Sequence, residues 1–343
     1  MSKKILLLVG VVAVVALFAV SSFQAKSAFL FSEDLDDVQQ EFLNFLAAYA
    51  KYYNSHDEFH ERFLIFKDNY KRIMQTDGAG MGFTLAINQF ADLTHEEFLK
   101  QYTGYRHLYK NKNTEGRVMA PNTGDHPAKY DQRDQGTVTR IKDQGSCGSC
   151  WSFSATGSIE GAHFQKSGEL VDLSEQQIVD CCRGGSYESD GCNGGLMTEA
   201  FDWVSKNGQC LDADYPYTAR TGTCKSTCEA KTHVDQTYHV KETVDAMEDA
   251  IYAEPVSVAV AVDFYFQFYS SGVFHCTRKQ ELNHGVVAVA YDEAKDSNGD
   301  AFFMIKNSWG NRWGENGYMR MLMKDSVSCC GCLDDADYAT TSD

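Results

Sequence analysis

The pattern of hydrophobic and polar positions changes along the chain. Residues from about 30 to 105 are predicted to form helices with little strand, and from Glu58 onward a set of residues repeats every three or four positions. Further helices are predicted from Cys150 to about Gln165 and from Leu173 to Val179, the latter opened by Asp172 or Ser174. After residue 235, apolar runs separated by Gly, Asn and Asp predict strands at residues 256–262, 286–290, 302–306 and 318–323. A helical half followed by a β-rich half predicts two subdomains with a cleft between them.

The helical N-terminal region has a regular face and a marked boundary. One helix face carries Glu58, Arg62, Phe66, Asn69, Ile73 and Asp77, and spacing alone also fits an ordinary amphipathic helix. After a short strand-like stretch, Thr94 can cap a second helix together with Glu97. Residues 104–127 are polar and aperiodic, which predicts a solvated strap and a place for proteolytic cutting.

The first residues predict entry into the secretory pathway. Lys3 and Lys4 precede an apolar run over residues 5–20, and small residues follow up to Ala25. The alternative is a membrane anchor, but this run of 16 residues is shorter than a spanning helix, which needs roughly 20 residues. We expect a cleaved signal peptide, no stable membrane insertion, and a lysosomal, vacuolar or extracellular destination.

Composition and charge exclude two classes of protein. With 43% hydrophobic and 13% aromatic residues among its 343 positions, the chain can bury a core and is not disordered throughout. Its net charge of −17 argues against nucleic acid as a partner. Residues 126–343 carry 18 basic and 33 acidic groups, against 13 and 15 before them, which indicates two parts with different roles.

The twelve cysteines all follow residue 146 and indicate an oxidising compartment. Cys147 and Cys150 form a CxxC with three interpretations. A zinc site lacks a second pair at finger spacing, and a thioredoxin-like pair lacks its βαβ setting. The third interpretation places Cys147 in a disulfide and makes Cys150 a nucleophile at the start of a helix.

Physical chemistry favours the third interpretation. A thiol attacks as its thiolate, and a helix N-terminus with a nearby imidazolium lowers the thiol pKa from about 8.5 to roughly 3–4. The nucleophile needs a base and a residue that orients the base. His284 precedes one predicted strand and Asn307 follows another, so adjacent strands would bring the two side chains together. No metal ligand set or cofactor is expected.

The motifs around these residues resemble those of cathepsin L-like cysteine peptidases of the papain family, made as preproenzymes. The resemblance covers nearly everything after the signal peptide. Its motifs, in family order, are QGSCGSCWSFS, GCNGGLM, NHGV and KNSWGxxWGENGY. In the N-terminal region, Glu58, Arg62, Phe66, Asn69 and Ile73 match the long-helix motif of the family's propeptide, and Asn88, Phe90 and Asp92 match a second motif.

The resemblance implies a fold and a division of the chain. The fold is α+β, a papain-like arrangement of a helical left subdomain and a β-barrel-like right subdomain, with a mainly helical propeptide before them. The division is a signal peptide at 1–25, an inhibitory propeptide at 26–125 and a mature peptidase domain at 126–343. Three residues differ from those usual in the family and bear on how the propeptide and the start of the mature domain pack. They are Asp77 in place of Asn, Ala86 in place of Gly, and Gln132 in place of Trp.

The resemblance also assigns roles to residues. It makes Cys150 the nucleophile, His284 its partner, Asn307 the residue that holds the ring and Gln144 an oxyanion donor, with Trp309 shielding the His–Asn hydrogen bond. Gly194 and Gly195 would pair with substrate as a short antiparallel strand. The pocket for the residue two positions before the scissile bond would be lined by Leu196, Met197, Ala259 and Leu282, with Asp335 at its floor. Asp335 could bind the guanidinium of a substrate arginine, or it could face solvent. Asp334 could instead be the residue at the pocket floor.

Three disulfides follow from the resemblance: Cys147–Cys192, Cys181–Cys224 and Cys276–Cys330. Besides these six cysteines and Cys150, five cysteines remain. Because five is an odd number, at least one of them is unpaired within the chain. Cys210–Cys228 is a suggestion from proximity, and the partner of Cys276 is open because Cys329 and Cys332 flank Cys330.

The leading hypothesis is therefore a cysteine endopeptidase acting through a thioester acyl-enzyme, stored as a proenzyme and activated by propeptide removal at acid pH. The alternatives are a catalytically silent homologue that serves as a binding or inhibitor protein, and a propeptide that inhibits related peptidases in trans. The expected partners are protein and peptide substrates, the chain's own propeptide and cystatin-like inhibitors, with the enzyme a monomer.

Overall fold

The computed structural model describes residues 37–342, except 77, 107–116, 226–227, 277–279, 295–298, 326 and 328. The predicted signal peptide lies outside the described residues, as does Asp77. The chain divides into two compact units, one up to Lys71 and one from Arg72 onward. No helix in the described part of the chain is both long and apolar enough to cross a membrane.

The first unit is built from α2 (Asp37–Ala48) and the greater part of α3 (His56–Gln75), which extends past the unit boundary. Its core is aromatic. The ring of Phe42 lies 5.4 Å from that of Phe59, 5.3 Å from Phe63 and 5.1 Å from Phe66. Phe66 belongs to the helix face predicted from the sequence and is fully buried, whereas Phe59 and Phe63 were not in the predicted set.

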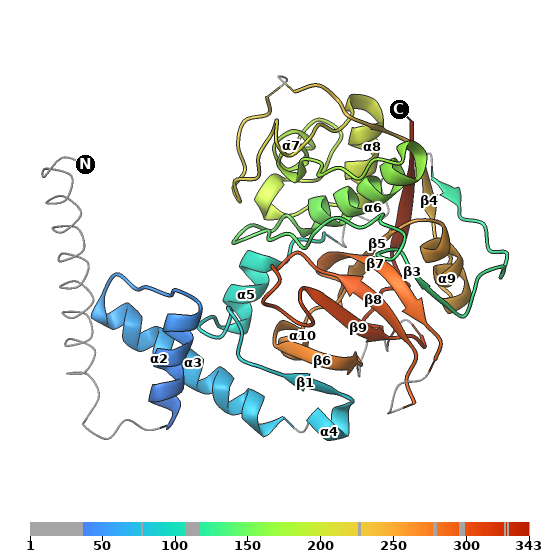
Figure 1. Ribbon diagram of the computed structural model, residues 1–343. Coiled ribbons are helices and arrows are strands. Elements are labelled where there is room, and N and C mark those ends of the chain that lie inside the picture. Colours follow the sequence, from blue (N-terminus) through green and yellow to red (C-terminus); the bar gives the residue numbers. More distant parts are fainter. Residues whose placement is uncertain are drawn as a thin grey trace, which may run out of the picture. The chain divides into compact units, whose positions relative to one another are not determined.

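The second unit contains a layer of helices against a ten-stranded sheet (Figure 1). The strand order is β1-β6-β9-β8-β7-β5-β10-β4-β2, and β3 pairs with β7. The helices are α4 (Gly78–Met81), α5 (His95–Tyr102), α6 (Cys150–Ser167), α7 (Glu175–Cys181), the 3-10 turn η2 (Gly191–Asn193), α8 (Met197–Asn207), α9 (Val244–Ala253) and α10 (Phe264–Gln267). The strands are β1 (Phe83–Leu85), β2 (Val118–Met119), β3 (Lys129–Asp131), β4 (His233–His239), β5 (Val256–Val260), β6 (Tyr269–Phe274), β7 (His284–Asp292), β8 (Phe302–Lys306), β9 (Tyr318–Leu322) and β10 (Ala336–Ser342).

The helix boundaries follow local signals in the sequence. Thr94 and Glu97 form a reciprocal capping box at the start of α5, which confirms the prediction. Ser174, rather than Asp172, caps α7 through its hydroxyl. The helix α6 ends at Gly168, whose φ of 75° is in the left-handed region where glycine is favoured.

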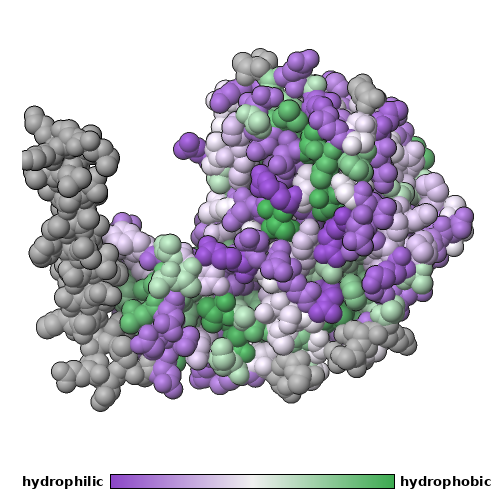
Figure 2. Space-filling model, viewed as in Figure 1, coloured by the Kyte–Doolittle hydropathy of each residue, from purple (hydrophilic) through white to green (hydrophobic). Residues whose placement is uncertain are grey.

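The central helix α6 positions the two halves of the second unit. It packs on α7 and α8 and also on β5, β7 and β10, and most of its residues from Cys150 to His163 are buried. This arrangement confirms the predicted α+β architecture with a helical half and a β-rich half. Figure 2 shows a mostly hydrophilic surface in the region of α6, α7 and α8, crossed by narrow apolar strips.

The structure shows how Gln132 is accommodated and revises the expectation that residues 104–127 form a solvated strap. Gln132, where the family usually has Trp, is fully buried and its amide donates to the Ile251 carbonyl at 2.7 Å. Residues 104–127 are not solvated throughout, since Tyr105 is only 6% exposed and β2 pairs in parallel with β4. Because the strap is polar overall, its composition did not indicate that single side chains within it are buried.

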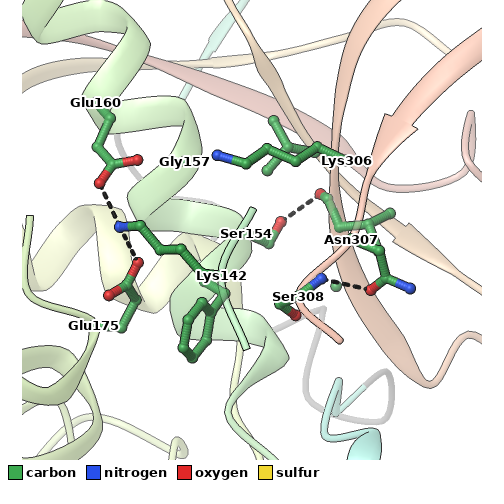
Figure 3. Close-up of a pocket in the computed structure, with 12 residues that line it drawn as sticks. Lys142, Ser154, Gly157, Glu160, Glu175, Lys306, Asn307 and Ser308 are labelled. Carbon is green, nitrogen blue, oxygen red and sulfur yellow. Dashed lines mark hydrogen bonds and ion pairs between the residues drawn. The ribbon is translucent and has the colours of Figure 1, made fainter. Parts of the chain in front are cut away.

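A buried cluster of charges links the two halves (Figure 3). The Lys142 ammonium lies 2.6 Å from Glu160 of α6 and 2.6 Å from Glu175 of α7. Thr139 donates to Glu160 and accepts from Lys306, the last residue of β8. The cluster borders a small cavity of about 20 Å³ that Asn307 and Ser308 also line. Burial would lower the pKa of Lys142, but the two carboxylates raise it well above its usual value.

Replacing Lys142 by Met should destabilise the protein, because two buried carboxylates lose their shared cation. We expect a loss of about 3–5 kcal/mol in the free energy of unfolding, measured by urea denaturation. Lys206→Met is the control, since Lys206 forms an exposed ion pair with Asp202 and should cost less than about 0.5 kcal/mol. Equal stability of the Lys142 variant and the wild type would show that the cluster does not hold the halves together.

Candidate active site

Cys150 is the first residue of α6 and is fully buried. Backbone N–H groups of Gly285, Gly104, Trp151 and Cys150 itself donate toward its sulfur. These donors favour the thiolate, as expected at a helix N-terminus. Burial acts against them and raises the pKa of the Cys150 thiol to about 12, so the covered site holds a neutral thiol.

His284 and Asn307 meet because β7 and β8 are antiparallel neighbours. His284 begins β7, Asn307 follows β8, and the His284 Nε2 lies 2.8 Å from the Asn307 Oδ1. Since the amide oxygen accepts, Nε2 carries the proton and Nδ1 is left as the acceptor. Nδ1 makes no hydrogen bond among the described residues, and His284 adjoins Gly285, which contacts the Cys150 sulfur.

The surroundings of His284 exclude water. The indole ring of Trp309 stacks on the imidazole with centroids 4.5 Å apart, and both residues are almost fully buried. Burial lowers the pKa of His284 to about 4, although the Asn307 hydrogen bond acts in the opposite direction. The imidazole is therefore neutral at physiological pH in this covered state.

The amide oxygen and the amide nitrogen of the Gln144 side chain both form hydrogen bonds within the site. Its Oε1 accepts from the Ser308 hydroxyl at 2.6 Å, which turns the Nε2 toward the site. That Nε2 donates to the carbonyl oxygens of Cys147 and of Tyr102, at 2.9 and 3.1 Å. The Trp309 indole N–H also donates to the Tyr102 carbonyl, at 3.1 Å. The Tyr102 carbonyl, at the end of α5, thus accepts hydrogen bonds from two side chains of the site, those of Gln144 and Trp309.

The segment after α5 lies along the predicted glycine pair. The N–H of Gly195 donates to the Gly104 carbonyl at 2.8 Å, and the N–H of Arg106 donates to the Gly195 carbonyl at 3.2 Å. The bridge between Tyr105 and Gly195 is parallel, opposite to the direction expected for a substrate. A Cβ on Gly104 would collide with the Gly148 backbone, so this position requires glycine. Gly194 has a φ of 108° and also faces this segment.

The residues predicted to line the pocket lie close together. Tyr105 packs in one buried apolar cluster with the four predicted lining residues, Leu196, Met197, Ala259 and Leu282. Its hydroxyl donates to Asp335, which is 3% exposed and therefore does not turn to solvent. Burial, and then the charge of Asp335, raise the pKa of the Tyr105 phenol far above its usual value. Tyr105 was missed in the sequence, where two tyrosines, Tyr105 and Tyr109, in a polar strap were the available signal.

Ten of the twelve cysteines are paired. The structure joins the three pairs implied by the resemblance, Cys147–Cys192, Cys181–Cys224 and Cys276–Cys330, together with Cys210–Cys228 and Cys329–Cys332. Cys150 and Cys182 are free and buried. Cys147–Cys192 joins the loop before α6 to η2, next to the Gly194–Gly195 pair.

Two groups of side chains bring three or more potential metal-ligand atoms close together in the described part of the chain. They are His126, Glu248 and Glu293, and His239, Asp335 and Asp337. Neither group includes Cys150, His284 or Asn307.

Comparison with known proteins agrees with this geometry. Residues 126–340 match the family model described as papain family cysteine protease, and residues 42–98 match that of the cathepsin propeptide inhibitor domain. The senescence-specific cysteine protease SAG12 of Arabidopsis thaliana is 39% identical, over 88% of this chain and 90% of that protein. A cathepsin L-like peptidase of Aedes aegypti is 38% identical, over 88% and 93%.

Solved structures of proenzymes have the same fold. The recombinant stem bromelain precursor has a TM-score of 0.80 and 37% identity, covering 89% of this chain and 99% of its own. Digestive procathepsin L 3 from the larval midgut of Tenebrio molitor has a TM-score of 0.78 and 33% identity, covering 89% and 100%. The chain therefore belongs to the papain family, as a cathepsin L-like cysteine protease that carries a propeptide inhibitor domain ahead of its protease domain.

Proposed function

We propose that this protease is an endopeptidase whose catalytic residues are Cys150, His284 and Asn307. The observation that carries the proposal is the convergence of a thiol at a helix N-terminus with an imidazole fixed by an amide oxygen at 2.8 Å. In this account the free Nδ1 of His284 exchanges a proton with the Cys150 sulfur, and Asn307 holds the ring in the required tautomer.

The chemistry begins when the propeptide leaves and water reaches the site. His284 then gains the thiol proton, and the thiolate attacks the peptide carbonyl carbon to form a tetrahedral oxyanion. The Gln144 Nε2, released from the Tyr102 carbonyl, and the Cys150 backbone N–H stabilise that oxyanion. The imidazolium proton passes to the leaving amine, the C–N bond breaks, and a thioester remains. Water then attacks the thioester with His284 as base, releasing the acid product and the thiol.

The residues before 126 act as the inhibitor in this account. The Tyr102 carbonyl takes the Gln144 donor, Gly104 covers the sulfur, and Tyr105 fills the substrate pocket. Since residues 104–106 run parallel to Gly195, they do not present a bond in the orientation expected of a substrate. We propose cutting near residues 120–127 to give a mature domain from about residue 126, in a chain delivered through the secretory pathway by the segment at 1–25.

The strap before this junction is held by a carboxylate of α9. The Asp249 Oδ2 accepts the backbone N–H groups of Thr123, at 2.5 Å, and Gly124, at 3.0 Å. Protonation removes the charge from such an acceptor and weakens both bonds, so acid should loosen the strap. Glu248, the residue before Asp249, has a carboxylate oxygen 3.9 Å from the Nε2 of His126 at the end of the strap. Burial raises the pKa of Glu248 to about 7, so it already carries a proton through most of the acid range.

The nucleophile is tested by Cys150→Ala in the mature enzyme. Turnover of a fluorogenic peptide should fall by at least about 10⁴-fold, because no thioester can form, while the fold remains intact by circular dichroism. Cys182→Ala is the matched control, since it removes the other free buried thiol and should leave turnover nearly unchanged. Appreciable activity in Cys150→Ala would remove the proposed mechanism, and an inactive wild type would favour the catalytically silent homologue.

Acid activation is tested by following propeptide removal from pH 7 to pH 4. Processing should accelerate on the acid side, and Asp249→Ala should process several-fold faster than the wild type at pH 7. Asp235→Ala, an exposed carboxylate on β4, serves as the control. A flat pH profile, or an Asp249 variant that processes at the wild-type rate, would point to a separate activating peptidase.

Specificity is tested at Asp335, which we propose reads a basic residue two positions before the scissile bond. The wild type should cleave peptides with Arg there as well as peptides with Leu, Val or Phe, because a buried carboxylate gains from a guanidinium partner. Asp335→Ala should lower kcat/KM for the Arg peptide by more than about 10-fold and change the Phe peptide little. Equal losses for both peptides would mean that Asp335 supports the pocket without reading charge.

A further inference from the structure

A second buried carboxylate lies directly behind the pocket floor. Asp337 of β10 is two residues beyond Asp335, which directly precedes the strand. Oxygen atoms of the two carboxylates and a ring nitrogen of His239 all lie within 4.8 Å of one another. The Asp337 side chain is 3% exposed. Two buried carboxylates, rather than one, therefore lie together at the proposed pocket floor.

A guanidinium from the strap pairs with one of these two acids, Asp337. The Arg117 Nη1 lies 2.9 Å from the Asp337 Oδ1 and 3.1 Å from its Oδ2, and the Arg117 side chain is only 11% exposed. His239, opposite Asp337 on β4, adds a ring nitrogen at 3.1 Å from the Oδ1. Burying an ion pair in this way is favourable only while both partners are present.

Tyr105 and Arg117 approach the acid pair together. The Tyr105 hydroxyl donates to Asp335, and the charges of Asp337 and Arg117 both act on the Tyr105 phenol. Both donors precede residue 126. When the residues before 126 are removed, Asp335 loses the Tyr105 hydroxyl and Asp337 loses the Arg117 guanidinium. Among the described residues, the His239 ring remains hydrogen-bonded to Asp337.

We propose that Asp337 and Asp335 together form a guanidinium site, filled by Arg117 in the proenzyme and by a substrate arginine in the mature enzyme. This inference rests on the proposed function of Asp335 and adds a second specificity-determining carboxylate to it. An arginine entering where Tyr105 lies reaches about as far as the tyrosine hydroxyl. Its planar fork of five donors can serve two carboxylates at once, which a lysine ammonium does less well.

The test compares substrates that differ only in charge. Mature enzyme is assayed on three peptides that carry Arg, its neutral isostere citrulline, or Leu two positions before the scissile bond. The wild type should prefer Arg over citrulline by at least 10-fold in kcat/KM, and Asp337→Asn should remove most of that preference while changing the Leu peptide less than about 3-fold. Asp235→Asn controls for the loss of one surface charge.

Two further variants keep the outcome decisive. Asp337→Glu retains the carboxylate and should retain the Arg preference, even if Asp337→Asn gives little folded enzyme. Arg117→Gln alters the proenzyme alone, so it should speed propeptide removal and leave the mature Arg preference unchanged.

The possible failures are distinguishable. If Asp335→Asn removes the Arg preference but Asp337→Asn keeps it, the proposed function of Asp335 stands and Asp337 serves only to hold the strap. If Asp337→Asn lowers the Leu and Arg peptides equally, Asp337 supports the pocket and does not read charge. Either result overturns the inference.

Discussion

The site depends on one constraint, the burial of a thiol at the start of α6 against the first residues of β7, a central strand of the sheet. Cys150 receives backbone N–H groups from its own helix and from Gly285 at the start of β7. The same strand begins with His284, whose partner Asn307 comes from β8. The buried cluster around Lys142 joins α6, α7 and the end of β8 (Figure 3), so the elements that carry the thiol and the imidazole are fixed to one another.

The same burial would explain how the proposed catalytic pair, Cys150 and His284, is stored in an inactive state. Desolvation raises the pKa of Cys150 to about 12 and lowers that of His284 to about 4, so neither side chain is charged beneath the residues that cover them. The donors that favour a thiolate are already in place. In the proposed account, residues 102–106 block the site sterically, occupy the Gln144 donor and, by excluding water, keep the proton on sulfur. Their departure on propeptide removal would then change the protonation state together with access.

Local signals in the sequence predicted the elements, and specific motifs predicted the candidate site. The Thr94–Glu97 capping box and the apolar runs of β7 and β8 act within a few residues, and the motif around Cys150 is distinctive. Contacts between distant residues were not predictable. Tyr105 meets Asp335 across 230 positions, and Arg117 meets Asp337 across 220. Both contacts start from a polar, aperiodic strap, where neither hydrophobic periodicity nor turn chemistry indicates which side chain is buried.

The central claim is that the covering segment keeps Cys150 as a thiol by excluding water. The most direct measurement is an ultraviolet titration of thiolate absorbance in proenzyme and mature enzyme, each corrected with its Cys150→Ser counterpart. Because the difference isolates one sulfur, it reports its protonation rather than its accessibility. The account predicts no Cys150 thiolate in the proenzyme across neutral pH, and a thiolate in the mature enzyme well below the usual thiol pKa of about 8.5. Equal thiolate signals in the two forms would contradict it.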